Sequence, residues 1–133
     1  MGCGAPGTAS PKNPRITIVV ADDDAQVRKF LRMVLTGAGY DVIEAANGRE
    51  ADETIRSRRA DLLITDLVMP EQEGIETILA LRKSNASLKI VAISGAFEGR
   101  YLEAVASLGA DATILKPVSP RDLLNTVSAV LAG

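Results

Sequence analysis

The sequence alternates five times between a short apolar stretch and a segment with helical periodicity. The apolar stretches are rich in β-branched residues and begin near residues 16, 40, 61, 89 and 111. A spacing of about 20 to 28 residues accommodates a strand and the crossover helix that parallel strands require. The pattern therefore predicts an α/β fold of the (βα)5 type. Because such crossovers are right-handed, we expect helices on both faces of a parallel sheet.

Four of the predicted strands are short runs that are mainly apolar and rich in β-branched residues. The fifth alternates between apolar and polar residues, which suits an edge strand with one wetter face. The apolar strands are predicted at Ile16–Ala21, Leu62–Thr65, Ile90–Ile93 and Ala112–Leu115, and the alternating one at Tyr40–Glu44.

Helix signals fill the segments between these strands. Asp24, Asn47 and Ser119 stand at predicted helix starts, where a side-chain oxygen can accept a backbone N–H. Asn47 with Glu50 forms a capping-box pattern, and Pro120 suits a first helical position. Apolar residues at helical spacing mark four of the predicted helices: Val27, Phe30, Leu31 and Val34; Ile75, Ile78 and Leu79; Leu102, Val105 and Leu108; and Leu123, Val127, Val130 and Leu131.

Composition narrows the available chemistry. The chain has no histidine and one cysteine, Cys3, so it cannot hold a histidine-dependent catalytic triad, a histidine-ligated metal or an internal disulfide. A net charge of -2 argues against a free nucleic-acid- or membrane-binding module. The apolar runs are too short to span a membrane, and no signal-peptide pattern opens the chain, so we expect a cytoplasmic protein. Residues 1–14 are predicted to be a flexible tail, followed by one domain over residues 15–133.

Polar residues follow four of the predicted strands. Residues Asp22–Asp24 come after the first apolar run and Asp66 after the third, while Ser94 and Lys116 follow the last two. The carboxyl ends of parallel strands share one edge of the sheet, and open α/β sheets bind ligands at that edge. We therefore expect several carboxylates, one hydroxyl and one ammonium group to converge there.

Such a cluster of carboxylates needs positive charge, because neighbouring anions repel. Lys116 supplies one charge, and Mg²⁺, which prefers oxygen ligands, would supply the rest. This set of groups suits phosphoryl transfer, with Asp66 as a nucleophile that forms an acyl phosphate. Each residue alone also has a structural explanation: the three residues Asp22–Asp24 could cap a helix, with Asp24 as the N-cap, and Asp66 and Ser94 could be turn or loop residues. The four strand ends taken together favour a site.

These residues resemble the receiver domain of bacterial response regulators, the CheY-like family. The resemblance covers the chain from about Ile16 to Leu131. It implies a flavodoxin-like three-layer sandwich with strand order 2-1-3-4-5, in a chain that consists of a single receiver domain. The motifs that carry it are Val19–Asp24, Arg28, Thr65–Pro70, Gly74, Ser94–Gly95 and Lys116–Pro117.

The resemblance implies a role for each matching position. Asp66 looks like the phosphoacceptor, Ser94 like the switch hydroxyl, and Lys116 like the counter-ion of the phosphoryl group, aimed by a Lys-Pro bond that is typically cis. Gly95 is small enough to admit a phosphodonor. The implied Mg²⁺ ligands are Asp22, Asp23, Asp66 and the backbone carbonyl of Val68.

The resemblance also implies partners. The donor would be a sensor histidine kinase or a histidine phosphotransfer protein, and the output would be a changed protein-binding surface or a phosphorelay. The usual partner face combines the fourth helix, fifth strand and fifth helix, and a homodimer is also compatible with the family. We expect no direct binding of nucleic acid or membrane. The residues of that face are Arg100, Tyr101, Thr113 and Arg121.

Four positions depart from the family pattern. Thr113 replaces an aromatic switch residue, and Glu73 stands where Asp commonly precedes the loop glycine. Val68 and Ala96 cannot orient a hydrolytic water, which predicts slow loss of the phosphoryl group.

A cluster of basic residues ends the second predicted helix. We interpret Arg56, Arg58 and Arg59 as a solvated helix terminus.

Two other functions fit parts of the same pattern. One is a Mg²⁺-dependent phosphohydrolase with an aspartyl intermediate, although Val68 stands where such enzymes usually carry an acid/base Asp. The other is a receiver-like scaffold that is never phosphorylated, although the complete set of polar residues argues against it. We therefore expect that the protein is not an enzyme acting on other substrates and that it catalyses only its own phosphorylation and slow dephosphorylation.

Overall fold

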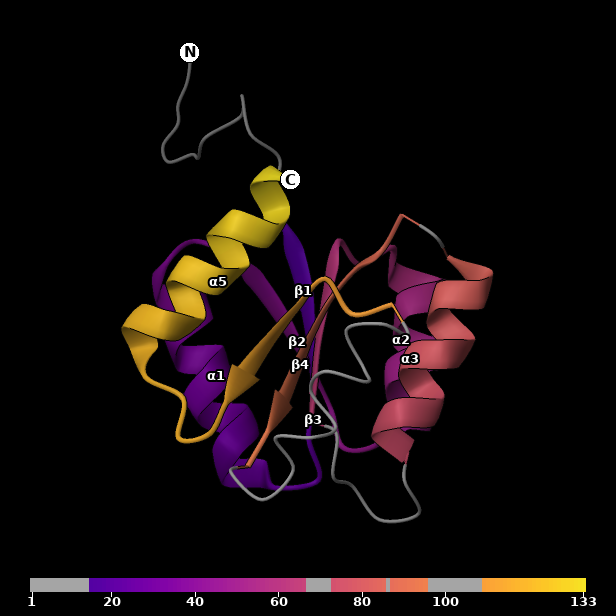
Figure 1. Cartoon of the computed structure of the whole chain (residues 1–133), viewed down its shortest axis with the longest axis horizontal. Coiled ribbons are helices and arrows are strands. Elements are labelled where there is room, and N and C mark those ends of the chain that lie inside the picture. Colours follow the sequence, from indigo (N-terminus) through magenta and orange to yellow (C-terminus); the bar gives the residue numbers. More distant parts are fainter. Residues whose placement is uncertain (1–14, 67–72, 86, 96–108) are drawn as a thin grey trace.

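The computed structural model describes residues 15–66, 73–85, 87–95 and 109–133, and it confirms the predicted α/β fold. Five parallel strands form one sheet in the order β2-β1-β3-β4-β5 (Figure 1). The predicted tail (1–14) and the predicted helix around residues 102–108 lie outside the described residues. The strands are β1 (Thr17–Ala21), β2 (Asp41–Ala45), β3 (Leu62–Asp66), β4 (Lys89–Ser94) and β5 (Ala112–Leu115); the helices are α1 (Ala25–Gly37), α2 (Gly48–Arg58), α3 (Glu73–Ser84) and α5 (Pro120–Ala132).

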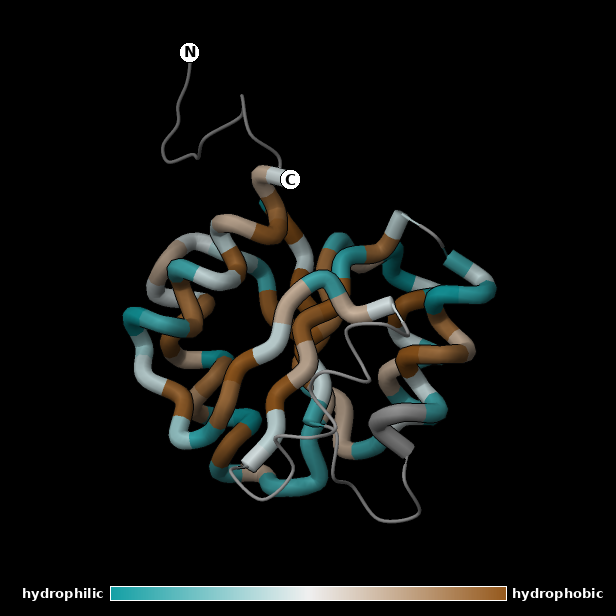
Figure 2. The backbone as a smooth tube through the Cα atoms, in the orientation of Figure 1, coloured by the Kyte–Doolittle hydropathy of each residue, from teal (hydrophilic) through white to brown (hydrophobic). Residues whose placement is uncertain are grey.

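The sheet is the middle of three layers. Helices α1 and α5 cover one face, and α2 and α3 cover the other (Figure 1). Alternate residues of the inner strands therefore enter two separate cores: Ile18 and Ile64 pack toward α1 and α5, whereas Val19 and Leu63 pack toward α2 and α3. All four of these side chains are fully buried. Brown, hydrophobic segments accordingly run through the middle of Figure 2. The alternating strand predicted at Tyr40–Glu44 lies at the sheet edge as β2.

The predicted helix caps form as expected. The side chain of Asp24 accepts the N–H of Gln26, and the side chain of Asn47 accepts that of Glu50. Ser119 caps α5 in the same way. Each accepted N–H belongs to a first helical turn, which has no partner inside its own helix. The capping residues therefore fix where α1, α2 and α5 begin.

The predicted third helix, marked by Ile75, Ile78 and Leu79, is present as α3, but Leu79 does not lie on its buried face. The structure buries Ile78 and Leu81 and leaves Leu79 45% exposed. Positions 78 and 81 are three apart and share one helix face, whereas residue 79 is rotated by about 100° from residue 78. Leu79 therefore points away from the sheet, and Thr77 is buried in its neighbourhood instead.

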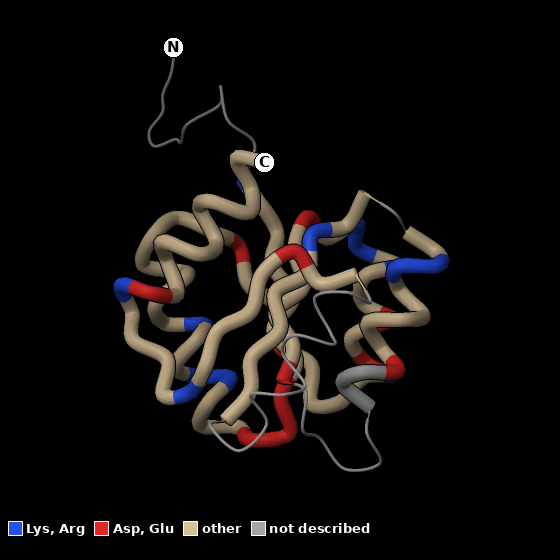
Figure 3. Tube along the Cα trace, viewed as in Figure 1, with Lys and Arg blue, Asp and Glu red and all other residues tan. Residues whose placement is uncertain are grey.

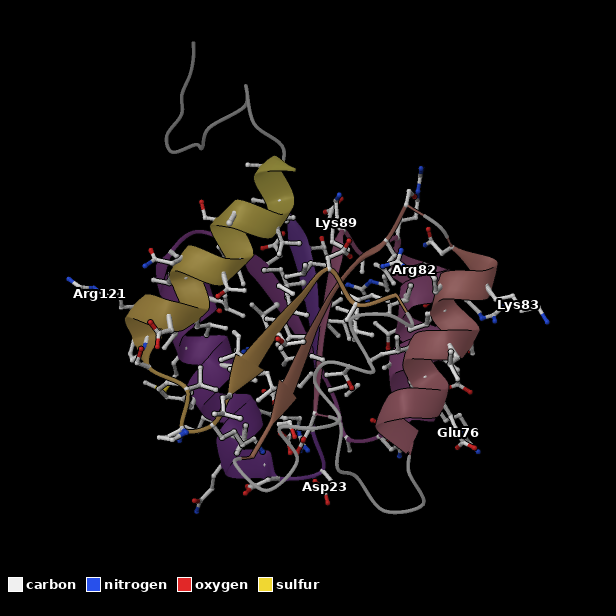
Figure 4. The ribbon with its side chains drawn as sticks, viewed as in Figure 1. Asp23, Glu76, Arg82, Lys83, Lys89 and Arg121 are labelled. Carbon is white, nitrogen blue, oxygen red and sulfur yellow. The ribbon has the colours of Figure 1, made fainter. Side chains whose placement is uncertain are left out.

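Arg82 ties the end of α3 to the start of β4 and β5. Its Nη1 donates to the carbonyl of Leu88 at 2.6 Å, and its Nη2 donates to the carbonyl of Gly109 at 2.6 Å and to Asp111 Oδ2 at 2.9 Å. The Asp111 carboxylate also accepts the N–H of Ile90. Figure 4 shows Arg82 directed toward the sheet and Lys83 directed away from it. One guanidinium thus satisfies two carbonyls and one carboxylate.

We expect Arg82→Met to lower the free energy of unfolding by about 2–4 kcal/mol, because it removes these hydrogen bonds together and leaves partly buried acceptors without a donor. Urea unfolding followed by circular dichroism measures the change. Lys83→Met is the matched control, and it should change stability by no more than about 0.5 kcal/mol because residue 83 is exposed. Equal effects of the two substitutions would contradict the structural role of Arg82.

Among the described residues, none of the helices has the length and apolar character that crossing a membrane requires.

Candidate functional site

Three carboxylates meet at the carboxyl-terminal edge of the sheet, as the sequence predicted. Asp66 is the last residue of the central strand β3, and Asp22 and Asp23 directly follow the adjacent strand β1. One oxygen from each of the three carboxylates lies within 4.8 Å of the others. Figure 3 shows red, acidic segments gathered at this end of the sheet. Asp22 and Asp66 are buried, whereas Asp23 is exposed and its side chain points outward in Figure 4.

Lys116 brings a positive charge to the same place from the end of β5. Its Nζ lies 3.0 Å from Asp66 Oδ2 and 3.7 Å from Asp22 Oδ2. The Lys116–Pro117 peptide bond is cis, as the resemblance implied. The backbone N–H of Lys116 donates to the carbonyl of Ser94 at 2.7 Å, which fixes the start of the loop after β5. The ammonium group therefore faces the carboxylates that the sequence assigned to it.

Ser94 occupies the end of β4, next to the strand that carries Asp66. In the β3–β4 register Asp66 lies opposite Ile93, so Ser94 is one residue beyond Asp66 toward the site. Its side chain is fully buried, and its Oγ donates to the carbonyl of Gly95 over 3.5 Å, a long hydrogen bond. Val68, the other predicted contributor, lies outside the described residues.

Burial and repulsion from neighbouring carboxylates disfavour the charged form of Asp22. The pKa of this carboxyl is raised from 3.8 to about 6, chiefly because burial disfavours the charged form and further because Asp66 and Asp23 repel it. The N–H of Asp24 and the charge of Lys116 act in the opposite direction without cancelling the rise. One lysine is thus insufficient to neutralise the cluster, and a further cation would be stabilised there.

The pKa of Lys116 responds to the same groups. Burial lowers it, but the hydrogen bond to Asp66 and the charges of Asp66, Asp22 and Asp23 outweigh burial and leave it raised above 10.5. Lys116 is therefore fully charged at neutral pH. An ammonium held beside a carboxylate in this way can stabilise additional negative charge that arrives at that carboxylate.

The donor atoms suit a hard divalent cation. All three clustered side chains offer carboxylate oxygens, which are the ligands that Mg²⁺ prefers, together with water and phosphate oxygens. The exposed Asp23 leaves one side of the cluster open to solvent, as Mg²⁺ requires because it retains several waters. The chemistry of the site therefore agrees with the Mg²⁺ predicted from the sequence.

Two residues beside the cluster, Arg28 and Glu44, were not predicted to have a role in the site. Arg28 was noted as part of the motif that carries the resemblance, and Glu44 was noted only as a residue of the edge strand. In the structure their side chains form an ion pair with 3.2 Å between Arg28 Nε and Glu44 Oε1, and Arg28 also reaches the backbone of Asp22. The register of β1 and β2, which places Glu44 opposite Val20, is the information that would have revealed this contact.

Comparison with known proteins agrees with this geometry. The sequence model of the response regulator receiver domain matches residues 18–128. The response regulator receiver protein CpdR of Brucella abortus is 38% identical over 115 residues, which cover 86% of this chain and 95% of CpdR. The phosphate regulon transcriptional regulatory protein PhoB of Pseudomonas aeruginosa is 35% identical over 117 residues, but the match covers only 51% of PhoB. The chain thus spans about half the length of PhoB.

Solved structures give the same result. A CheY-like receiver domain protein from Methanospirillum hungatei superimposes with a TM-score of 0.84 at 29% identity, covering 90% of this chain and 95% of the other. The chemotaxis protein CheY4 of Vibrio cholerae superimposes with a TM-score of 0.82 at 28% identity, covering 88% and 99%. Since the fold, the acidic edge and the sequence match agree over nearly the same residues, this chain belongs to the response regulator receiver domain family of two-component systems.

Proposed function

We propose that this receiver domain accepts a phosphoryl group on Asp66. The observation that carries the proposal is the contact of 3.0 Å between Lys116 Nζ and Asp66 Oδ2, inside a cluster of three carboxylates. This contact holds a positive charge beside the one clustered carboxylate that ends the central strand. Neither a purely capping role for Asp22 nor a turn role for Asp66 requires such a lysine.

The proposed reaction is phosphoryl transfer from a phosphohistidine. A carboxylate oxygen of Asp66 forms a bond to phosphorus while the bond between phosphorus and the donor imidazole nitrogen breaks. The imidazole keeps the electron pair and takes a proton from water. Lys116 stabilises the negative charge that arrives with the phosphoryl oxygens. Mg²⁺ bound to Asp22, Asp23, Asp66 and the carbonyl of Val68 would neutralise the remaining charge on those oxygens.

We propose that Ser94 then reports the phosphoryl group to the rest of the domain. A buried hydroxyl with one long hydrogen bond gains more from a new phosphoryl acceptor than a well-bonded hydroxyl would. A ligand that bonds better to one conformation shifts the population toward it. The shifted population would present a different surface to a partner or pass the phosphoryl group onward.

A phosphohistidine donor must lie outside this sequence, because the sequence contains no histidine. A sensor histidine kinase or a histidine phosphotransfer protein is the partner class that we propose, acting in the cytoplasm. For the output surface we propose the face that includes β5 and α5, to which a homodimer partner could also bind. Leu115 on the edge strand β5 is 48% exposed, which supports a contact surface there. Arg100 and Tyr101 of that proposed face lie outside the described residues.

The test is intact mass spectrometry of the wild-type chain after incubation with acetyl phosphate. We expect a gain of one phosphoryl group in the presence of Mg²⁺ and little or no gain in EDTA. A chain that gains no mass in Mg²⁺ would overturn the proposed function. Release of inorganic phosphate from small phosphate esters over many turnovers would instead favour the phosphohydrolase alternative.

Loss of the phosphoryl group is predicted to be slow. Hydrolysis requires a water aligned behind the phosphorus atom, and neither Val68 nor Ala96 has a polar side chain that could hold one. Both positions lie outside the described residues, so this prediction rests on residue type alone. We expect the phosphorylated form to persist well beyond seconds at neutral pH, measured by mass spectrometry after removal of acetyl phosphate. A lifetime of only seconds would contradict the prediction.

A further inference from the structure

The Asp22–Asp23 segment needs an external restraint, because its carboxylates repel one another and Asp66. One oxygen from each of the three carboxylates lies within 4.8 Å of the others, and these anions would separate if the segment after β1 moved outward. A metal site with its carboxylates already in place avoids the cost of assembling them on binding. The groups that hold this segment against repulsion therefore bear directly on cation affinity.

The structure anchors both backbone polar groups of Asp22 to the neighbouring edge strand β2. The N–H of Asp22 donates directly to the carbonyl of Ala45 at 3.2 Å. The carbonyl of Asp22 accepts a hydrogen bond of 2.6 Å from Nη1 of Arg28. The same guanidinium donates through Nε to Glu44 Oε1 at 3.2 Å. Strand β2 contributes no member of the carboxylate cluster, yet it supports Asp22 from both sides of the residue.

Arg28 is well suited to this task. Its side chain is only 16% exposed and Glu44 is 29% exposed, so the pair lies in a partly desolvated environment where charged hydrogen bonds are strong. The planar guanidinium presents donors in fixed directions and can serve the Asp22 carbonyl and the Glu44 carboxylate at the same time. Arg32 also pairs with Glu44, at 3.3 Å, but its side chain is 60% exposed.

We infer that Arg28, oriented by Glu44, is a positioning residue for the cation site: it fixes the backbone of Asp22 so that the carboxylates of Asp22 and Asp23 stay within reach of Asp66. This inference rests on the proposed function. Arg28 acts on the backbone of this segment, since its Nη1 donates to the carbonyl of Asp22. Groups that orient metal ligands from outside typically change metal affinity by about 10- to 100-fold.

The test compares Arg28→Met with Arg32→Met, which remove the same charge and both remove a partner of Glu44. Mg²⁺ affinity is measured by calorimetry on the unphosphorylated chains, and urea unfolding checks that each chain is folded. We expect Arg28→Met to raise the Kd for Mg²⁺ about tenfold, and Arg32→Met to leave it within about twofold of wild type because Arg32 makes no hydrogen bond to Asp22 among the described residues. The Kd of Arg28→Lys for Mg²⁺ should lie between those of wild type and Arg28→Met. A lysine ammonium keeps the charge but lacks the planar set of donors with which a guanidinium contacts two acceptors at once.

Three results would overturn the inference. One is a Kd for Arg28→Met within twofold of wild type, and another is an equal loss in Arg32→Met, which would indicate a charge effect. If Arg28→Met does not fold, Arg28→Lys decides, and an unchanged Kd in that variant overturns the inference. Wild-type chain that binds no Mg²⁺ at all would overturn the proposed function as well, so the two failures are distinguishable.

Discussion

Asp66→Asn will leave the chain unable to gain a phosphoryl group from acetyl phosphate in Mg²⁺. The substitution replaces the carboxylate oxygen that attacks phosphorus with a neutral amide, which is a far weaker nucleophile. It also removes the charge that Lys116 contacts at 3.0 Å. Intact mass spectrometry under the conditions that modify the wild-type chain should show only the unmodified mass. The effect is all or none, and no other single substitution is expected to change the reaction as much.

Asp24→Asn is the matched control for this experiment. Asp24 lies on the same edge of the sheet but is exposed, and it serves as the N-cap of α1, a task that Asn performs equally well. The control should gain one phosphoryl group as the wild-type chain does. If Asp66→Asn still gained a phosphoryl group, the acceptor would be another residue, and fragmentation of the modified chain would identify it. An unmodified Asp24→Asn would show that the reaction depends on more of this loop than we propose.

The main features of the fold and site were predictable because they depend on local patterns and on one rule of sheet geometry. Apolar runs and helix caps defined the strands and helices. Asp22, Asp66 and Lys116 stand at the carboxyl ends of their strands, and parallel strands place these ends on one edge of the sheet whichever face each connecting helix covers. The strand limits shifted by a residue or so, as in β2, predicted at Tyr40–Glu44 and found at Asp41–Ala45. Such shifts reflect the sheet register, which no single strand specifies.

The contacts that the sequence did not predict depend on register and on long side chains. Arg28 reaches Asp22 and Glu44 only because β1 and β2 align Val20 with Glu44. Arg82 satisfies carbonyls on two distant segments, one of them at Gly109. Leu79 looked like a core residue because it is apolar, but its angular position on α3 points it to solvent. A hydrophobic pattern specifies which faces are buried, whereas these contacts depend on how the faces are aligned.

Asp22→Asn should stabilise the metal-free protein while weakening its affinity for Mg²⁺. The folded-state pKa of Asp22, about 6, lies above the ordinary value of 3.8. The folded chain therefore binds this proton more readily than the unfolded chain does, and the stability that Asp22 contributes is lost as the pH rises through 6. Asparagine carries no charge and can still accept the N–H of Asp24 that Asp22 Oδ1 accepts at 2.9 Å. We expect the variant to be up to about 3 kcal/mol more stable than wild type in EDTA at pH 7.5.

Urea unfolding in EDTA across the pH range measures this difference. The advantage of Asp22→Asn should shrink as the pH falls below 6 and vanish near the ordinary pKa of 3.8, where Asp22 is protonated in both states. Asp24→Asn again serves as the control, and it should lack the gain in stability of Asp22→Asn at pH 7.5, because Asn keeps the N-cap of α1. A difference between Asp22→Asn and wild type that does not depend on pH would show that the buried charge is not its cause.

Mg²⁺ should reverse the order of stability. A cation that binds only the folded chain stabilises it by about 4.1 kcal/mol at a concentration of about 1,000 times its Kd, which exceeds the advantage expected for Asp22→Asn. Wild type should gain this amount, whereas Asp22→Asn, which lacks one of the clustered carboxylates, should gain much less. Equal stabilisation of the two chains by Mg²⁺ would contradict a ligand role for Asp22. A reversal would show that the repulsion at this edge is a cost of the cation site, because the residue that destabilises the metal-free fold is one that Mg²⁺ requires.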